Sequence, residues 1–279
     1  MNELELIAEI GVNHDGNLDK AKMLIDEAQK AGFDTVKFQA FSPDELATKT
    51  AGIADYQAST GHSKQYDMLS ELALSNRGLE ELKGYSEKSG INFLATPFGL
   101  SSLDFLSDAL GLKRIKISSG DLTFGQLLKR SGEKHLDLVL STGMGTLDEI
   151  RHALAVYYLG RAGVSDLDIS FELINQSDPS ILSKTDDANV SLMHCTSCYP
   201  APVSNLNMLA LETIREQFGF ANLGYSDHST SFTAGIMAIA YGAVVIEKHL
   251  TMDKTLSGPD HSSSLQASKA RAFVENMRE

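Results

Sequence analysis

"NLGYSDH", residues 222–228, is a short apolar run that ends on polar residues, and "VVIEKHL", residues 244–250, repeats the pattern. Between them lies SFTAGIMAIAYGA, residues 231–243, an almost wholly apolar stretch that we interpret as a well-buried helix. This strand–helix–strand order predicts two neighbouring parallel strands, because parallel strands need a crossover connection and a helix usually provides it. His228 and His249 would then lie at the same end of adjacent strands.

The same alternation extends along the whole chain. Further strand-like runs occupy residues 5–11, 34–41, 92–98, 114–120, 136–144 and 190–196. Helical periodicity occupies residues 17–32, 75–90, 101–111, 146–160, 205–219 and 266–279. Eight strands that alternate with helices over about 250 residues predict a (β/α)₈ TIM barrel, an α/β fold. We expect a single domain over residues 1–279.

An open doubly wound sheet is the alternative fold, but no G-x-G-x-x-G follows the first strand. Two segments interrupt the rhythm. Residues 42–76 form a long loop after the second strand, of the kind that often covers a barrel's active site. Residues 160–189 are interpreted as an acidic insertion, partly helical, that precedes the sixth strand and has no catalytic role.

Composition excludes several classes of function. The net charge of -13 argues against a general nucleic-acid or membrane-surface binder, which needs a basic face. The chain starts with acidic residues where a signal peptide carries basic ones, and no apolar run approaches the roughly 20 residues of a membrane span. We therefore expect a soluble, cytoplasmic protein.

Two cysteines, Cys195 and Cys198, stand in a C-x-x-C spacing that is typical of a redox pair or half a metal site. The chain has no second cysteine pair, which excludes a zinc ribbon. We interpret Cys195 as part of a buried strand and Cys198 as part of the loop after it.

Polar residues gather at the carboxyl end of nearly every predicted strand, where barrel active sites form. They are Glu9, Asn13, His14, Lys37, Gln39, Thr96, Lys116, Ser118, Ser119, Ser141, Thr142, His194, Thr196, Ser197, Tyr199, Ser226, Asp227, His228, Glu247, Lys248 and His249. Such residues are costly inside apolar strands unless they are paired. As a pair at adjacent strand ends, His228 and His249 can converge on one divalent metal. Two imidazoles suit Mn²⁺, Zn²⁺, Co²⁺ or Fe²⁺ better than Mg²⁺.

Lys37 and Lys116 project from the second and fourth strands toward the same end of the barrel. With Ser119, Ser141 and Ser226 as hydrogen-bond donors, they could form a cradle for a phosphate or carboxylate. The alternatives are that each lysine pairs with Glu9 or another acid, or that one lysine forms a Schiff base as in aldolases.

Nine motifs, in order, resemble those of the sialic acid synthase family, which includes N-acetylneuraminate, legionaminate and pseudaminate synthases and spore-coat polysaccharide relatives. The motifs are AEIGVNHDG, VKFQAF, FLATPF, KISSGDL, STGM, HCTSCYPAP, GYSDH, EKHLT and GPDH. They cover residues 4–265 approximately. The resemblance implies a transferase that condenses phosphoenolpyruvate with an N-acylated hexosamine, such as N-acetylmannosamine. The products are a nine-carbon 2-keto acid and phosphate.

The resemblance also implies roles for single residues. His228 and His249 would hold the metal, usually Mn²⁺, which polarises the sugar aldehyde. Phosphoenolpyruvate would contact Lys37, Thr96, Lys116, Ser119, Ser141, Ser197 and Ser226. The sugar would be positioned by Glu9, Gln39, Tyr199 and Asp260. Glu9 is the candidate for proton transfer, and the lysines would stabilise charge on the departing phosphate.

Family members usually continue into a small antifreeze-like domain, which covers the partner's active site in a domain-swapped dimer. This chain ends at Glu279, so we expect the barrel domain without that C-terminal domain, and a homodimer stays open. Two other functions stay open as well. One is a pyruvate-dependent aldolase or lyase, and the other is a barrel that binds ligand without turnover.

Overall fold

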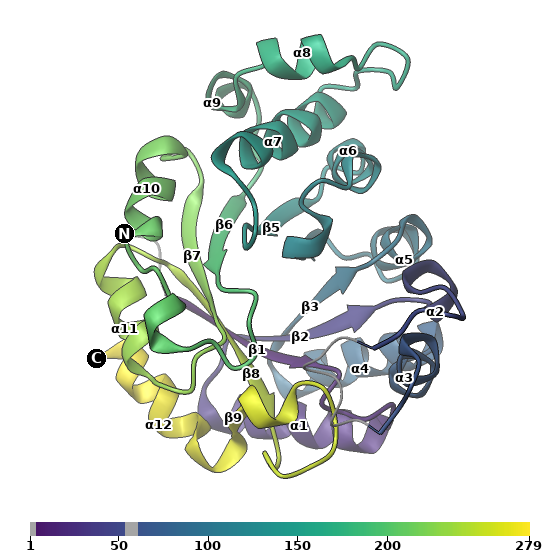
Figure 1. Cartoon of the computed structure of the whole chain (residues 1–279), viewed down its shortest axis with the longest axis vertical. Coiled ribbons are helices and arrows are strands. Elements are labelled where there is room, and N and C mark those ends of the chain that lie inside the picture. The colour runs from purple at the N-terminus through teal and green to yellow at the C-terminus, as the bar shows by residue number, and fades with distance from the viewer. Residues whose placement is uncertain (1–3, 54–60) are drawn as a thin grey trace.

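The computed structural model describes residues 4–53 and 61–279 and shows a nearly closed parallel barrel (Figure 1). The hydrogen-bonded strands follow the order β3-β2-β1-β8-β7-β6-β5-β4, and the two end strands, β3 and β4, are in contact. The barrel strands are β1 (Glu5–Gly11), β2 (Thr35–Ala40), β3 (Asn92–Pro97), β4 (Arg114–Ile117), β5 (Asp137–Ser141), β6 (Val190–Cys195), β7 (Asn222–Asp227) and β8 (Val245–Thr251). A further two-residue strand, β9 (Leu265–Gln266), pairs with β8. The predicted barrel is confirmed, and each predicted strand matches an observed one.

Helices surround the strands on the outside of the barrel (Figure 1). They are α1 (Leu18–Ala31), α4 (Asn76–Ser89), α5 (Leu100–Asp104), α6 (Gly125–Glu133), α7 (Leu147–Arg161), α10 (Ala210–Gln217), α11 (Thr233–Ala240) and α12 (Ala267–Arg278). Helix α1 begins and ends at the residues that the sequence predicts. The Asn17 side chain accepts hydrogen bonds from the backbone amides of Asp19 and Lys20 at the start of the helix, and Gly32 ends the helix with a φ of 93°. The sequence analysis named no helix at α6, whose short sequence contains an internal glycine.

Helix α11 corrects the expectation of a well-buried helix. Its small residues Ala234, Gly235 and Ala238 are buried, but Ile236 and Met237 are 43% and 40% exposed. A helix on the outside of a barrel packs only one face inward, whereas hydropathy alone cannot say which face that is.

The barrel interior changes from apolar to polar along the strands. A cluster of buried side chains fills the middle: Ile7, Leu94, Val139, Met193 and Val245. Two residues further along the same strands lie Glu9, Thr96, Ser141, Cys195 and Glu247. Because alternate strand residues face the same side, these side chains form the next layer toward the carboxyl ends. The apolar layer therefore closes the barrel beneath a polar floor.

Two excursions leave the regular alternation. After β2, the chain forms α2 (Pro43–Leu46) and α3 (Gln65–Leu72), and α3 packs Met68 and Leu72 against Val12 and Phe41. The segment before β6 carries α8 (Phe171–Gln176) and α9 (Pro179–Leu182), which lie against α7 at the periphery of the molecule (Figure 1). In the described part of the chain, no helix is both long enough and apolar enough to cross a membrane.

Candidate active site

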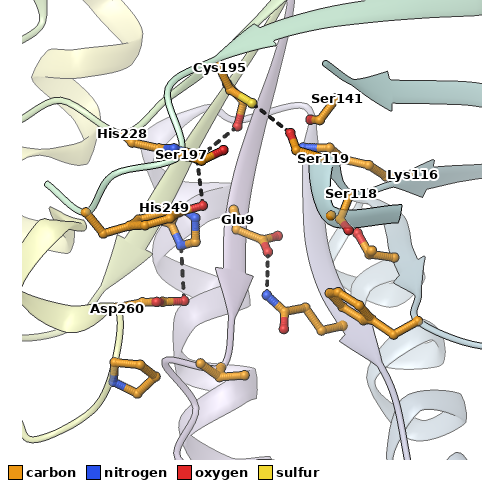
Figure 2. A pocket seen from close by; sticks show the side chains of 18 of the residues that line it. Glu9, Lys116, Ser118, Ser119, Ser141, Cys195, Ser197, His228, His249 and Asp260 are labelled. Carbon is orange, nitrogen blue, oxygen red and sulfur yellow. Dashed lines mark hydrogen bonds and ion pairs between the residues drawn. The ribbon is translucent and has the colours of Figure 1, made fainter. Parts of the chain in front are cut away.

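A cavity of about 760 Å³ opens at the carboxyl ends of the strands, and all eight strands contribute to it. The residues to which the sequence analysis gave a role all lie in its lining, and Figure 2 labels several of them: Glu9, Lys37, Gln39, Thr96, Lys116, Ser119, Ser141, Ser197, Tyr199, Ser226, His228, His249 and Asp260. Other polar strand-end residues do not line it: Asn13, His14, Thr142, His194, Thr196, Asp227 and Lys248. The cavity also includes Glu247, which the sequence analysis named at a strand end without a role, and Cys195 and Cys198, which it had not assigned to the site. Its size suits a ligand of small-molecule dimensions.

Buried ion pairs occupy the floor of the cavity. Lys37 Nζ lies 2.7 Å from Glu9 Oε2, and Lys116 Nζ lies 2.6 Å from Glu247 Oε1. Glu247 Oε2 is also 3.7 Å from Lys37 Nζ, and Ser226 Oγ donates to Glu247 Oε1 at 2.8 Å. The alternative that each lysine pairs with an acid is thus what the structure shows, and the pairs lie inside the predicted site. The sequence analysis named Glu247 among the polar strand-end residues but gave it no role, although it stands two residues before His249 on the same strand face.

The two carboxylates have different proton affinities. Burial raises the pKa of Glu9, and its single close lysine only partly opposes that effect. Burial acts on Glu247 in the same direction, but Lys116 and Lys37 outweigh it and hold the pKa of Glu247 below its ordinary value. Two carboxylates whose pKa values are pushed apart are typical of sites that divide acid and base roles. Glu9 is the one suited to exchange a proton.

His228 and His249 lie side by side, with ring centroids 5.6 Å apart. His228 Nδ1 is 2.7 Å from the carbonyl oxygen of Thr196, so Nδ1 carries the proton. Nε2 is then unprotonated, and it lies 3.3 Å from the hydroxyl groups of both Ser226 and Tyr199. Burial lowers the pKa of His228 to about 4 and the pKa of His249 well below its ordinary value. Both imidazoles are therefore neutral at pH 7, the form that binds a metal.

Asp260 approaches this pair from the loop after β8. Its Oδ2 lies 3.7 Å from His249 Nδ1, and this nitrogen is buried without a hydrogen bond to the described residues (Figure 2). Burial, reinforced by Glu9, raises the pKa of Asp260 to about 7. Within the described part of the chain, no three acidic, histidine or cysteine side chains are gathered as a preformed metal site. The neutral nitrogens of the two histidines could serve as donors to a metal.

A second polar group lies on the opposite side of the cavity, beside Lys116. Ser119 Oγ accepts a hydrogen bond from the Gly143 amide at 3.0 Å and lies 3.0 Å from Cys195 Sγ. A Cβ on Gly143 would lie 2.7 Å from Cys195 Sγ and 2.8 Å from Ser197 Oγ, so the backbone approaches both side chains closely. Cys195 is buried and Cys198 exposed, as interpreted from the sequence, and both are free thiols.

The remaining wall of the cavity is apolar. It comes from the two loops around β1 and β2 and from the end of β3, and its members are Val12, Leu46, Met68, Leu69, Leu72 and Phe98. Sequence analysis expected residues 42–76 to cover the site. Helices α2 and α3 do line it, and residues 54–60 of that segment lie outside the described residues. The side chains involved could not be named in advance, because the segment's contacts with Val12 and Phe98 are long-range.

A closed parallel barrel with a polar cavity at the carboxyl ends of its strands is the architecture of TIM-barrel enzymes. Residues 24–279 match the NeuB family, and the chain belongs to that family. It is 39% identical to the N,N'-diacetyllegionaminic acid synthase of Legionella pneumophila, over 98% of this chain and 71% of that protein. The synthase of the same name from Campylobacter jejuni is 37% identical over 100% of this chain and 77% of its own length.

A solved structure gives the same result for the fold. The N-acetylneuraminic acid synthetase of Leptospira borgpetersenii, in complex with citrate, superposes with a TM-score of 0.80 at 29% identity. The match covers 99% of this chain and 84% of that one. The resemblance inferred from the nine motifs is thereby confirmed.

Proposed function

We propose that this protein condenses phosphoenolpyruvate with the open-chain aldehyde of an N-acylated hexosamine. The products are a nonulosonic acid and inorganic phosphate. One observation carries the proposal: Lys37 and Lys116 converge on Glu247 in the cavity that also holds the adjacent His228 and His249. A site with two cations beside a neutral histidine pair can bind an anion next to a polarised carbonyl. The relatives described above are synthases of N,N'-diacetyllegionaminic acid and of N-acetylneuraminic acid.

The anion would bind on the side of the cavity formed by β2 to β7. Lys37 and Lys116 provide charge, and hydroxyl groups from neighbouring strands provide hydrogen bonds: Thr96, Ser119, Ser141, Ser197 and Ser226. Lys37 Nζ already contacts Thr96 Oγ1 at 3.3 Å, so the cationic and hydroxyl groups lie within one ligand's reach. Phosphate oxygens accept charge-assisted hydrogen bonds from such a set.

The donor set on the other side fits a divalent metal such as Mn²⁺. His228 and His249 would hold it, because both rings are neutral and His228 Nε2 is unprotonated. When bound there, the metal would act as a Lewis acid on the aldehyde oxygen of the sugar. Thr196 fixes the tautomer of His228 through its carbonyl.

In the reaction, C3 of phosphoenolpyruvate forms a bond to the aldehyde carbon, and a water oxygen adds at C2. The C2–O bond to phosphate then breaks, which leaves the 2-keto group and releases phosphate. The water loses protons and the former aldehyde oxygen gains one, and Glu9 is placed to exchange them, since burial raises its pKa. Lys37 and Lys116 stabilise the charge on the departing phosphate.

The charge distribution also bears on the sugar. Among the described residues of the cavity lining, the basic side chains are Lys37, Lys116, His228 and His249. All four belong to the proposed anion and metal sites. Gln39, Tyr199 and Asp260 can contact hydroxyl or amide groups, whereas the wall beyond them is apolar. This pocket favours an uncharged sugar with acyl or methyl substituents over a sugar phosphate.

A Schiff-base aldolase is less compatible with the site. That chemistry needs a neutral lysine, but the carboxylates of Glu247 and Glu9 raise the pKa of Lys37 in spite of its burial. Lys116 Nζ forms an ion pair with Glu247 Oε1 at 2.6 Å. An assay of phosphate release distinguishes the synthase from two alternatives. One is a pyruvate lyase that uses a metal, and the other is a barrel that binds ligand without turnover.

The experiment is an assay of phosphate release from phosphoenolpyruvate with Mn²⁺ and a panel of sugars: N-acetylmannosamine, its 6-phosphate and a di-N-acetylated 6-deoxyhexose. His228→Ala is the control. The proposal expects stoichiometric phosphate release that needs both substrates and is lost in the variant. Condensation with pyruvate and no phosphate would instead identify a lyase. Binding of phosphoenolpyruvate without turnover of any sugar would identify a ligand-binding barrel.

A further inference from the structure

Two loops meet behind Asp260. One is residues 12–17, between β1 and α1, and the other is residues 252–264, after β8. Asp15 Oδ1 lies 2.9 Å from His261 Nε2, and Asn13 Nδ2 donates to Ser264 Oγ at 2.8 Å. These contacts join the two ends of the chain. They fix the second loop against the first at residues that directly follow Asp260.

The ring of His261 is tightly enclosed. It is 1% exposed, and its Nδ1 lies 2.7 Å from Thr251 Oγ1 while Nε2 faces Asp15. A Cβ at Gly258 would lie 2.6 Å from His261 Cδ2, so the loop passes directly over the ring. With a partner on each nitrogen and backbone above, the ring cannot turn without moving the residues on either side of it.

Asp260 is held through its backbone. Its carbonyl oxygen accepts hydrogen bonds from Ser264 Oγ at 2.7 Å and from Ser263 Oγ at 3.0 Å. Its carboxylate extends into the cavity, where Oδ2 lies 3.7 Å from His249 Nδ1 (Figure 2). The direction of that carboxylate therefore depends on where the loop places the backbone of residue 260, which the contacts to Asn13 and Asp15 determine.

We propose that Asp15 and His261 are positioning residues: their contact sets the direction of the Asp260 carboxylate in the cavity and so aligns the sugar. The inference rests on the proposed function, in which Asp260 contacts the sugar. Neither residue lines the cavity itself, so both act through Asp260. They should affect the use of the sugar and leave the anion cradle on the other strands unchanged.

Asp15 allows a matched set of variants. Its φ is 51°, in the left-handed region that glycine adopts without strain, so Asp15→Gly removes the carboxylate and leaves the turn. Asp15→Asn keeps an oxygen that can accept from His261. Lys20→Met removes only the outer ion pair of Asp15, at 2.7 Å, and is the control. His261→Ala removes the other partner.

Steady-state kinetics with both substrates is the first readout. We expect Asp15→Gly and His261→Ala to raise KM for the sugar about tenfold and to lower kcat, with KM for phosphoenolpyruvate within about twofold of the original. Asp15→Asn and Lys20→Met should keep the original values. Equal losses for both substrates would overturn the proposal, because they indicate a general structural role. Asp15→Gly decides the matter even where the buried His261→Ala does not fold.

A double-mutant cycle with Asp260→Ala is the second readout. Since Asp15 acts through Asp260, Asp15→Gly should have no further effect on kcat/KM in the Asp260→Ala background. A loss by the same factor in both backgrounds would refute the positioning role and leave the proposed function intact. Unchanged kinetics of Asp260→Ala alone would instead remove the role proposed for Asp260, on which this inference depends.

Discussion

Glu247 Oε1 lies 2.6 Å from Lys116 Nζ, at the position where the proposed phosphate would need that same lysine. Glu247 also faces Lys37, and Glu9 completes a set of two buried acids and two buried lysines. The floor of the cavity is thus balanced in charge before any ligand binds. An entering anion must compete with Glu247 for Lys116.

Removal of the Glu247 charge should strengthen anion binding. In Glu247→Gln, Lys116 and Lys37 lose part of their internal counter-charge, so we expect phosphoenolpyruvate to bind about tenfold more tightly, or about 1.4 kcal/mol. The free energy of unfolding should fall by about 3 kcal/mol, because one side of a buried ion pair is removed. Isothermal titration and urea denaturation measure the two effects. Weaker binding than in the original protein would show that Glu247 does not compete with the anion.

Gly143 should tolerate no side chain. In Gly143→Ala the new Cβ would meet Cys195, Ser197 and Ser119, the last at 2.9 Å, so the hydroxyl groups around the anion must move. A displacement of about 1 Å lowers kcat/KM for phosphoenolpyruvate by about 10²-fold. Gly120→Ala is the matched control, since its Cβ has only Ser118 Oγ nearby, at 3.8 Å, and should change the same constant little. Equal effects of the two substitutions would contradict this account.

Stability should decrease below neutral pH because of His14. Burial lowers the pKa of His14 to about 4, whereas the unfolded chain has the ordinary value of about 6.5. Between these values the unfolded state binds more protons, so stability is complete above pH 6.5 and is lost as pH falls toward 4. At pH 5 the loss from this residue is about 2 kcal/mol.

The measurement compares urea unfolding at pH 7 and pH 5 for the original protein and for His14→Asn. Asparagine can still accept the hydrogen bond that His14 Nδ1 receives from the Gly16 amide at 3.0 Å. The variant should lose less stability between the two pH values by about 2 kcal/mol. An identical pH dependence of the two proteins would assign the acid sensitivity to other groups.

A buried ion pair outside the cavity should matter for stability alone. Lys248 Nζ lies 2.7 Å from Asp227 Oδ2, and both side chains are 2% exposed or less. Lys248→Met leaves the Asp227 carboxylate buried without its counter-charge and should cost about 3 to 5 kcal/mol. The double variant with Asp227→Asn should be more stable than Lys248→Met. If the two losses instead add, the residues are not energetically coupled.

Much of the site could be predicted because alternation along a strand is strict. The histidines predicted at the ends of β7 and β8 do lie side by side, and the same rule separates Glu247, which faces the cavity, from Lys248, which does not. The sequence analysis named Glu247 and Lys248 together at this strand end. Alternation assigns Glu247 to the cavity, since that residue is two positions from His249.

Other features could not be predicted from local patterns. The contact between Ser119 and Cys195 joins the turn after β4 to β6, and β4 and β6 are not neighbours, so the contact depends on the curvature of the barrel. The pairing of Asp15 with His261 links opposite ends of the chain through two irregular loops. The exposure of Ile236 on α11 depends on which helix face meets the strands, and a uniformly apolar segment does not reveal that.

The turn after β1 also touches a third segment. Gly16 has a φ of 67°, and a Cβ there would lie 2.2 Å from the carbonyl oxygen of Glu71, at the end of α3. Residues 12–17 therefore support the apolar wall through Gly16 and the Asp260 loop through Asp15. Because the apolar wall and the Asp260 loop both pack on residues 12–17, they should open and close together as one cooperative unit. Amide hydrogens in α3 and in the loop after β8 should then exchange with solvent at rates that change together.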